Sequence, residues 1–165
     1  MRSRRRLAAV PFLLLALAAC SGDDPAPEPS TDLETIPAIE GRGDQELPTA
    51  DAQREALAAA GEVTEALVAP LAAGATETAQ VPDAPAGSYL LRVVCTSSDG
   101  APVVVTVRGG ETELTSYQAP CVPVYQGGST MADSDVFEVP GGALDVTVTA
   151  AAESVVAVGL AAAAG

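Results

Sequence analysis

Two missing residue types limit the chemistry open to this chain. The sequence contains no histidine and no lysine, so the commonest general base, the Schiff-base amine and the usual zinc ligands are absent. Catalysis would rest on carboxylates, and the candidate pair for glycoside hydrolysis is Glu111 and Glu113. The surrounding GGETE segment has the composition of a turn, which places both acids in an exposed loop. We therefore predict no catalytic residues and a protein that is not an enzyme.

The segment Asp133-Ser134-Asp135, beside Met131, raises a second possibility. Two carboxylates close together could contribute to a calcium site, but calcium takes six to eight oxygen ligands, and Val136 breaks any EF-hand pattern. A polar loop explains the segment as well, so no metal site is predicted.

Three tyrosines, Tyr89, Tyr117 and Tyr125, could stack against sugar rings. Aromatic residues make up only 3% of the chain and tryptophan is absent, which disfavours a typical carbohydrate-binding face. The sequence therefore assigns no ligand-binding residue.

The first twenty residues have the pattern of a secretory signal. A cationic MRSRRR segment precedes the apolar stretch Leu7–Ala19. As a helix this stretch would span about 20 Å, which is too short for a bilayer core of about 30 Å. Cleavage after Ala16-Leu17-Ala18, an A-x-A pattern, would release a soluble protein.

The residues Leu17-Ala18-Ala19-Cys20 resemble the lipobox of bacterial lipoproteins. The resemblance covers only residues 1–20, and no family is recognised for the rest. It implies that the signal peptide 1–19 is cleaved and that the Cys20 thiol receives a diacylglycerol, with the membrane as partner. Two or more acyl chains would anchor the protein stably at the outer face of the cell membrane. The composition resembles coding from a GC-rich genome such as that of an actinobacterium.

Acidic residues dominate the chain beyond the anchor. The formal net charge is −14 although four arginines precede the apolar stretch. A polyanion repels nucleic acid and anionic lipid headgroups, so neither is predicted as a direct ligand.

Residues 20–48 are predicted to form a disordered linker whose charges repel one another, because the segment is acidic, rich in proline and poor in large apolar residues. The linker contains Arg42-Gly43-Asp44, an integrin-recognition tripeptide whose use the sequence leaves undecided.

Residues 49–74 are predicted to form one amphipathic helix. They are rich in helix formers, although Gly61 and Pro70 weaken the pattern. The apolar residues that recur at three- or four-residue steps are Leu57, Ala60, Val63, Leu67 and Leu71. The sequence leaves open whether the helix packs on the following domain or on a partner.

Residues 81–165 are predicted to form a small antiparallel β-sandwich or barrel of six to seven strands. Residues 144–149 alternate between apolar and polar side chains. The segment SVVAVGLA is almost entirely apolar, which is typical of a strand covered on both faces. Asp99-Gly100 suits a tight hairpin turn.

Cys95 and Cys121 are predicted to form a disulfide, because an even pair outside the cytoplasm is normally oxidised. Closing this loop would stabilise the domain by about 3 kcal/mol. The pair lacks CxxC spacing and the chain lacks histidine, so neither a metal nor a cofactor is predicted.

Two functional classes follow. The first is an envelope lipoprotein that presents a β-sandwich as a binding or structural module, accessory to a membrane or cell-wall complex with a protein or cell-wall glycan as partner. The alternative is an extracellular module that captures carbohydrate or calcium.

Overall fold

The computed structural model describes residues 46–163, which all belong to one compact unit. Cys20, its lipobox and Arg42-Gly43-Asp44 lie outside the described residues, as does the predicted linker up to residue 45. No helix in the described part is long and apolar enough to cross a bilayer.

The described chain forms one short helix followed by ten strands and a single 3₁₀ turn. The elements are α1 Ala50–Ala59, β1 Thr64–Leu71, β2 Thr76–Ala84, β3 Gly87–Ser97, β4 Val103–Gly109, β5 Thr112–Ala119, β6 Val122–Pro123, η1 Val124–Gln126, β7 Thr130–Asp133, β8 Phe137–Val139, β9 Gly142–Ala150 and β10 Ser154–Ala162.

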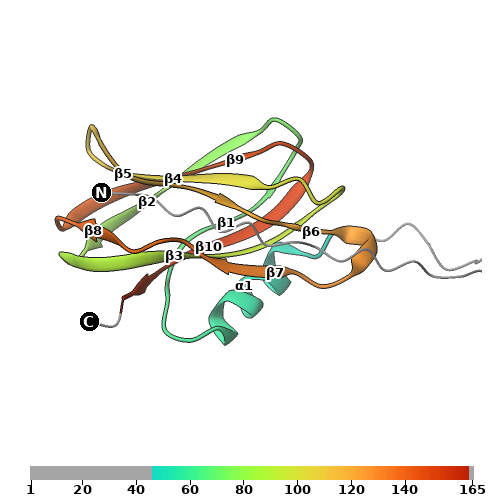
Figure 1. The fold of residues 1–165 in the computed structure, drawn as a ribbon, viewed down its shortest axis with the longest axis horizontal. Coiled ribbons are helices and arrows are strands. Elements are labelled where there is room, and N and C mark those ends of the chain that lie inside the picture. Colours follow the sequence, from blue (N-terminus) through green and yellow to red (C-terminus); the bar gives the residue numbers. More distant parts are fainter. Residues whose placement is uncertain (1–45, 164–165) are drawn as a thin grey trace, which may run out of the picture. The chain divides into compact units, whose positions relative to one another are not determined.

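The strands form two sheets packed as a sandwich (Figure 1). One sheet has the order β1-β10-β3, and the short strands β6, β7 and β8 all pair along the far edge of β3. Because α1 packs on its outer surface, we call it the helix-covered sheet. The second, which we call the open sheet, has the order β2-β9-β4-β5. The predicted mainly β sandwich with one helix is confirmed, and β3–β6 is a parallel pair among antiparallel ones.

Alternating valines build the core between the sheets. Apart from Gly109 and Gly142 at the strand ends, every second residue of β4 and β9 is fully buried, while the residues between them face outward; the buried ones are Val103, Val105, Val107, Leu144, Val146, Val148 and Ala150. The alternation predicted for residues 144–149 is therefore confirmed. It is expected for an antiparallel sheet that has one face buried in the core and the other exposed to water.

Strand β10 is the covered strand that the sequence predicted. It lies between β1 and β3, and its residues from Ser154 to Ala161 are all buried. Val156 and Val158 point into the sandwich core, whereas Ala157 packs with Leu57 of α1. Gly159 completes this contact, because a Cβ atom there would lie 3.2 Å from the Cβ of Val63 and 3.3 Å from Leu57 Cδ2.

The predicted helix 49–74 is wrong beyond Ala59. The helix ends there, Gly61 adopts a φ of +118°, and residues 64–71 form β1, paired antiparallel with β10. Leu67 and Leu71 share one face, as predicted, but they are buried in a strand, because a spacing of four residues keeps side chains on one face in both geometries. Pro70 is tolerated because β1 is an edge strand.

The boundary predicted at residue 81 is wrong for the same reason, since the sandwich begins at Thr64. The predicted hairpin at Asp99-Gly100 is also wrong. The turn is tight, with Gly100 at a φ of +89° and the Ala101 N–H donating to Asp99 Oδ1. However, β3 and β4 lie in different sheets, so the turn carries the chain across the sandwich.

The predicted disulfide is confirmed. Cys95 of β3 is joined to Cys121, which follows β5, with 4.7 Å between their Cα atoms. Both cysteines are buried, and the bond ties β3 to the short segment in which the chain passes from β5 of the open sheet to β6 of the helix-covered sheet.

Candidate functional site

The candidate site is an open groove of about 680 Å³ where α1 meets β1 and the ends of β3 and β10. Its apolar lining includes Leu57, Val63 and Leu160, and its aromatic residue is Tyr89. The charged residues that line it are Arg54, Glu62 and Glu65. The groove thus combines an aliphatic floor, one ring and charged hydrogen-bonding groups.

Helix α1 forms one wall and is held firmly on the sheet. Its N-terminus is capped by Thr49 Oγ1, which accepts a hydrogen bond from the Ala52 N–H at 3.2 Å. Gln53 is fully buried, and its Nε2 donates to Thr96 Oγ1 at 3.0 Å and to the Val155 carbonyl at 3.2 Å. These contacts fix the orientation of α1 on the sheet, so that Arg54 lines the groove.

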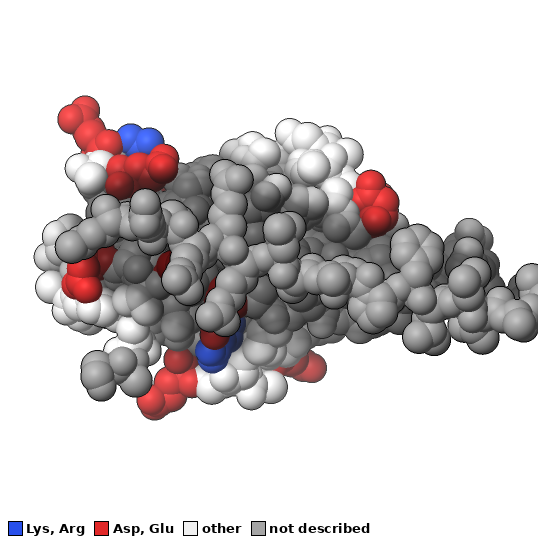
Figure 2. Space-filling model, in the orientation of Figure 1, with Lys and Arg blue, Asp and Glu red and all other residues white. Residues whose placement is uncertain are grey.

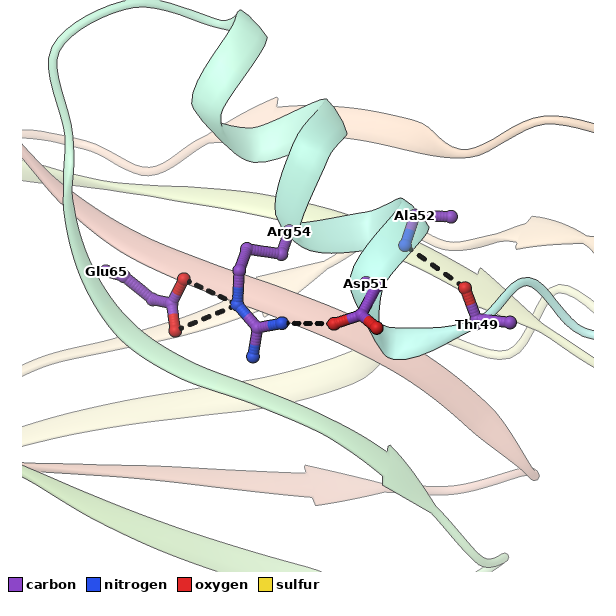
Figure 3. A network of polar contacts seen from close by, with 5 residues as sticks. All are labelled: Thr49, Asp51, Ala52, Arg54 and Glu65. Atoms are coloured by element: carbon purple, nitrogen blue, oxygen red, sulfur yellow. Dashed lines mark hydrogen bonds and ion pairs between the residues drawn. The ribbon is translucent and has the colours of Figure 1, made fainter.

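Arg54 connects α1 to β1 through two carboxylates (Figure 3). Its Nε donates to the two carboxylate oxygens of Glu65, at 3.3 and 3.0 Å, and its Nη1 donates to Asp51 Oδ1. About half of the side chains of Arg54 and Glu65 is exposed, so these pairs contribute little to stability. Their effect is to orient the guanidinium, whose Nη2 has no hydrogen-bond partner among the described residues.

At the other end of α1, Arg92 holds the last turn. Its Nη1 donates to the Ala60 carbonyl at 2.7 Å, while its Nε and Nη2 donate to the two oxygens of Asp133 at 2.8 and 2.7 Å. The hydrogen bond from Arg92 lowers the pKa of the Asp133 carboxyl, and the same bond raises the pKa of Arg92. Arg92 therefore satisfies a helix carbonyl and neutralises an acid at once.

The calcium hypothesis loses support from this pairing. Asp133 is occupied by Arg92, and Ser134 Oγ accepts the Leu91 N–H at 2.9 Å. Within residues 46–163 no three potential metal ligands lie close together. Asp133-Ser134 acts as a connector between β3 and the loop after β7.

The three tyrosines do not line one groove. Tyr89 alone lies in the site, on β3 opposite Ala162 of β10. Tyr117 packs from β5 against the core, where burial and then the charges of Asp133 and Asp135 raise its pKa. Tyr125 belongs to η1. The sequence could name the rings but not their surroundings.

Glu111 lies in the exposed turn between β4 and β5, as the sequence predicted, whereas Glu113 is exposed but belongs to β5, so its predicted place in a loop is wrong. Glu113 stands opposite Arg108 in the strand register, and Arg108 Nη2 donates to the Glu111 carbonyl at 2.6 Å. Neither acid lines the groove.

The charged residues of the groove were not identified from the sequence, because its pattern predicts a single helix over residues 49–74. Arg54 and Glu65 lie on different elements once the helix stops at Ala59. One signal was present: cations are scarce in this acidic chain, and of those that follow the leader, Arg54 lies on α1 and Arg92 donates to the carbonyl of Ala60 at the end of α1.

No protein-family model and no curated protein matches the chain. Similar solved structures include a ruminal GH26 endo-β-1,4-mannanase, with a TM-score of 0.43 and 16% identity over 64% of this chain and 21% of that chain. The C-terminal CBM6 of LamC, a laminarinase from Zobellia galactanivorans, gives a TM-score of 0.41 and 17% identity over 60% and 90%.

A carbohydrate-binding module, CBM6cm-2, from Cellvibrio mixtus lichenase 5A in complex with cellotriose gives a TM-score of 0.39 and 13% identity, over 63% of this chain and 92% of that chain. The chain thus spans about a fifth of the mannanase. Because every one of these TM-scores is below 0.5, no conclusion about the site or its ligand is drawn from these structures.

Proposed function

We propose that this protein is a non-catalytic binding module, held at the outer face of the cell membrane by a lipid on Cys20, that captures a carbohydrate in the groove beside α1. The observation that carries the proposal is the presence of Tyr89, an aliphatic floor and the hydrogen-bonding groups of Arg54 and Glu62 in one groove.

A sugar ring matches this combination of groups. Its C–H face packs on an aromatic ring, and its hydroxyls accept from a guanidinium and donate to a carboxylate. Arg54 is already oriented by Glu65, so its Nη2 is placed before a ligand arrives. Glu62 is exposed and has no ion-pair partner among the described residues, which leaves its oxygens able to accept.

The exposure and the hydrogen bonds of the carboxylates in the groove support binding without catalysis. Glycoside hydrolysis requires a general acid in a shielded environment beside a second carboxylate. Glu62 is exposed in an open groove, and Glu65 accepts both of its hydrogen bonds from Arg54. The chain supplies no histidine or lysine as another base.

The predicted lipid anchor and linker also support a role in carbohydrate binding. The lipobox at residues 17–20 is the basis for the anchor, and a flexible linker over residues 20–48 would extend about 30 Å. That reach would place the groove among envelope polymers rather than at the bilayer. Replacing Cys20→Ala is expected to move the protein from the membrane fraction to the soluble fraction, and unchanged fractionation would contradict the anchor.

A protein partner is the second candidate, as accessory subunit of a membrane or cell-wall complex. It requires a contiguous exposed apolar patch. The large apolar side chains exposed in the described part belong to separate elements, namely β4, η1, β7 and the loop before β8; they are Val104, Tyr125, Met131 and Val136. The groove, by contrast, gathers an aromatic ring, aliphatic side chains and charged groups in one place, which favours ligand capture.

A glycan microarray with the full-length protein in detergent tests the proposal. We expect wild type and Tyr89→Phe to bind a common set of oligosaccharides. Tyr89→Ala should bind them about tenfold more weakly, the equivalent of about 1.4 kcal/mol for a lost stacking contact. Equal binding by all three proteins, or no binding to any glycan, would contradict capture in the groove.

A further inference from the structure

The outer face of the open sheet carries a regular array of side chains, most of them polar, and two of its three rows contain no charged residue. The pairing of β2, β9, β4 and β5 aligns the outward residues in three rows across the strands. The rows are Thr76, Thr149, Val104 and Gln118; Thr78, Thr147, Thr106 and Ser116; and Gln80, Asp145, Arg108 and Glu113.

Hydrogen bonds between strands hold this array. The hydroxyls of Thr76 and Thr149 lie 3.0 Å apart, and those of Thr78 and Thr147 lie 2.9 Å apart. In the third row, Gln80 Nε2 donates to Asp145 Oδ1 at 3.1 Å. Threonine is also restricted at χ1 by its branched Cβ. The side chains are thus ordered before any partner arrives, which lowers the entropy lost on binding.

Each threonine pair retains both kinds of hydrogen-bonding capacity. One hydroxyl proton is used within the pair, so the second proton and the remaining lone pairs are available to a partner. The threonine methyl groups and Val104 add small apolar contacts between the hydroxyls. A partner that meets this face must offer donors, acceptors and C–H groups at short intervals.

Nothing in the described part covers this face. Helix α1 packs against β10, β3 and β1, which all belong to the other sheet (Figure 1). Thr76, Thr78, Gln80, Val104 and Gln118 are exposed.

The distribution of charged residues on this face limits the class of partner that it can bind. The first two rows contain no charged residue, whereas acidic groups are spread over much of the described surface in view (Figure 2). A polyanion would be repelled by a chain of net charge −14, and a polycation would be drawn to the acids elsewhere. The complementary partner is therefore uncharged, hydroxylated and extended.

We propose that the outer face of the open sheet is a second binding surface, which takes a strand of an uncharged polysaccharide. The surface lies on the sheet opposite α1 and shares no residue with the groove, so it does not depend on carbohydrate capture there. Two surfaces on one module would give avidity for a glycan layer, because the second contact forms at high effective concentration.

Co-sedimentation with insoluble neutral polysaccharides tests this inference. The full-length protein in detergent is mixed with particles of cellulose, β-1,3-glucan, mannan or starch. We expect it to bind at least one of them, and the double variant Thr78→Val, Thr147→Val to bind that polymer at least tenfold more weakly. Valine keeps the branched shape and the strand propensity, so the variant retains the sheet.

Two further variants distinguish binding on the open sheet from binding in the groove. Tyr89→Ala removes the groove contact and is expected to retain at least half of the sedimentation, whereas Thr147→Arg places a bulky charge in the middle row and is expected to abolish it. Binding that is lost in Tyr89→Ala but unchanged in both Thr147 variants would overturn the second surface and leave the groove proposal standing. Sedimentation with none of the four polymers would overturn the second surface as well.

Discussion

At the scale of single residues, Arg92 shows how one cation organises three segments. It lies on β3, donates to the carbonyl at the end of α1 and forms a two-bond pair with Asp133 of β7. Its side chain is only 20% exposed, so the pair is better shielded than the Arg54 pairs. The sequence identified Asp133 as a possible metal ligand, because it shows an acid but not the arginine that faces it.

We predict that Asp133→Asn lowers the free energy of unfolding by about 1 kcal/mol at pH 7, as expected for a well-oriented ion pair near the surface. The pKa of Asp133 is lowered in the folded protein by the hydrogen bond from Arg92. The pair therefore stabilises the fold above the ordinary aspartate pKa, and this contribution disappears as the pH falls through the lowered pKa.

Urea unfolding at pH 7 and in steps down to pH 2 would measure this dependence. Asp135→Asn is the matched control, since its exposed carboxylate has no ion-pair partner among the described residues. A constant difference between Asp133→Asn and wild type over the whole range would contradict the role of the charge.

At the scale of elements, the close approach of α1 to β10 depends on Gly159. A Cβ atom there would lie 3.3 Å from the Thr64 carbonyl oxygen as well as near Val63 and Leu57. A backbone oxygen cannot move aside as a flexible side chain can. We predict that Gly159→Ala lowers the free energy of unfolding by about 1–3 kcal/mol, the usual cost of overpacking.

Thermal unfolding of Gly159→Ala would check this, with Gly109→Ala as control. The added methyl of Gly109→Ala would lie at ordinary contact distance, 3.5 Å from Leu114 Cδ1. Equal melting temperatures for the two variants would show that α1 is not packed closely on β10.

The disulfide is a second contact that holds elements together, because it joins β3 to the segment just after β5. We predict that the double variant Cys95→Ala, Cys121→Ala is less stable by about 3 kcal/mol, since the 26-residue separation is no longer closed in the unfolded chain. The free energy of unfolding in guanidinium would measure the loss. A loss below about 1 kcal/mol would mean that the core alone joins the sheets.

The sequence predicted those elements whose pattern has a single interpretation. The alternation of residues 144–149 fits only a strand with one buried face, and the apolar run of β10 fits a strand covered on both faces. Residues 64–71 were misassigned because Leu67 and Leu71 suit a helix and a strand equally well. Pairing with β10 decided between them, and that contact spans about 90 residues of chain.

The groove could not be predicted for a related reason. Arg54, Glu65 and Tyr89 come from α1, β1 and β3, and only the fold brings them together. The rows of the open sheet likewise depend on strand order, and β2, β9 and β4 are not consecutive in sequence. Turn residues at 99–100 indicated a change of direction but not the sheet that the chain would enter.

For the molecule as a whole, we propose a lipid anchor on Cys20 and an acidic linker that carry a sandwich with a binding groove on one sheet and a polar binding face on the other. Carbohydrate capture in the groove is best tested by an NMR titration of the ¹⁵N-labelled protein with an oligosaccharide that the microarray selects. We predict that amide shifts change first at the groove, at Ala58, Thr64 and Tyr89. Shifts confined to residues away from the groove and from the open sheet, or no shifts at all, would contradict carbohydrate capture by this module.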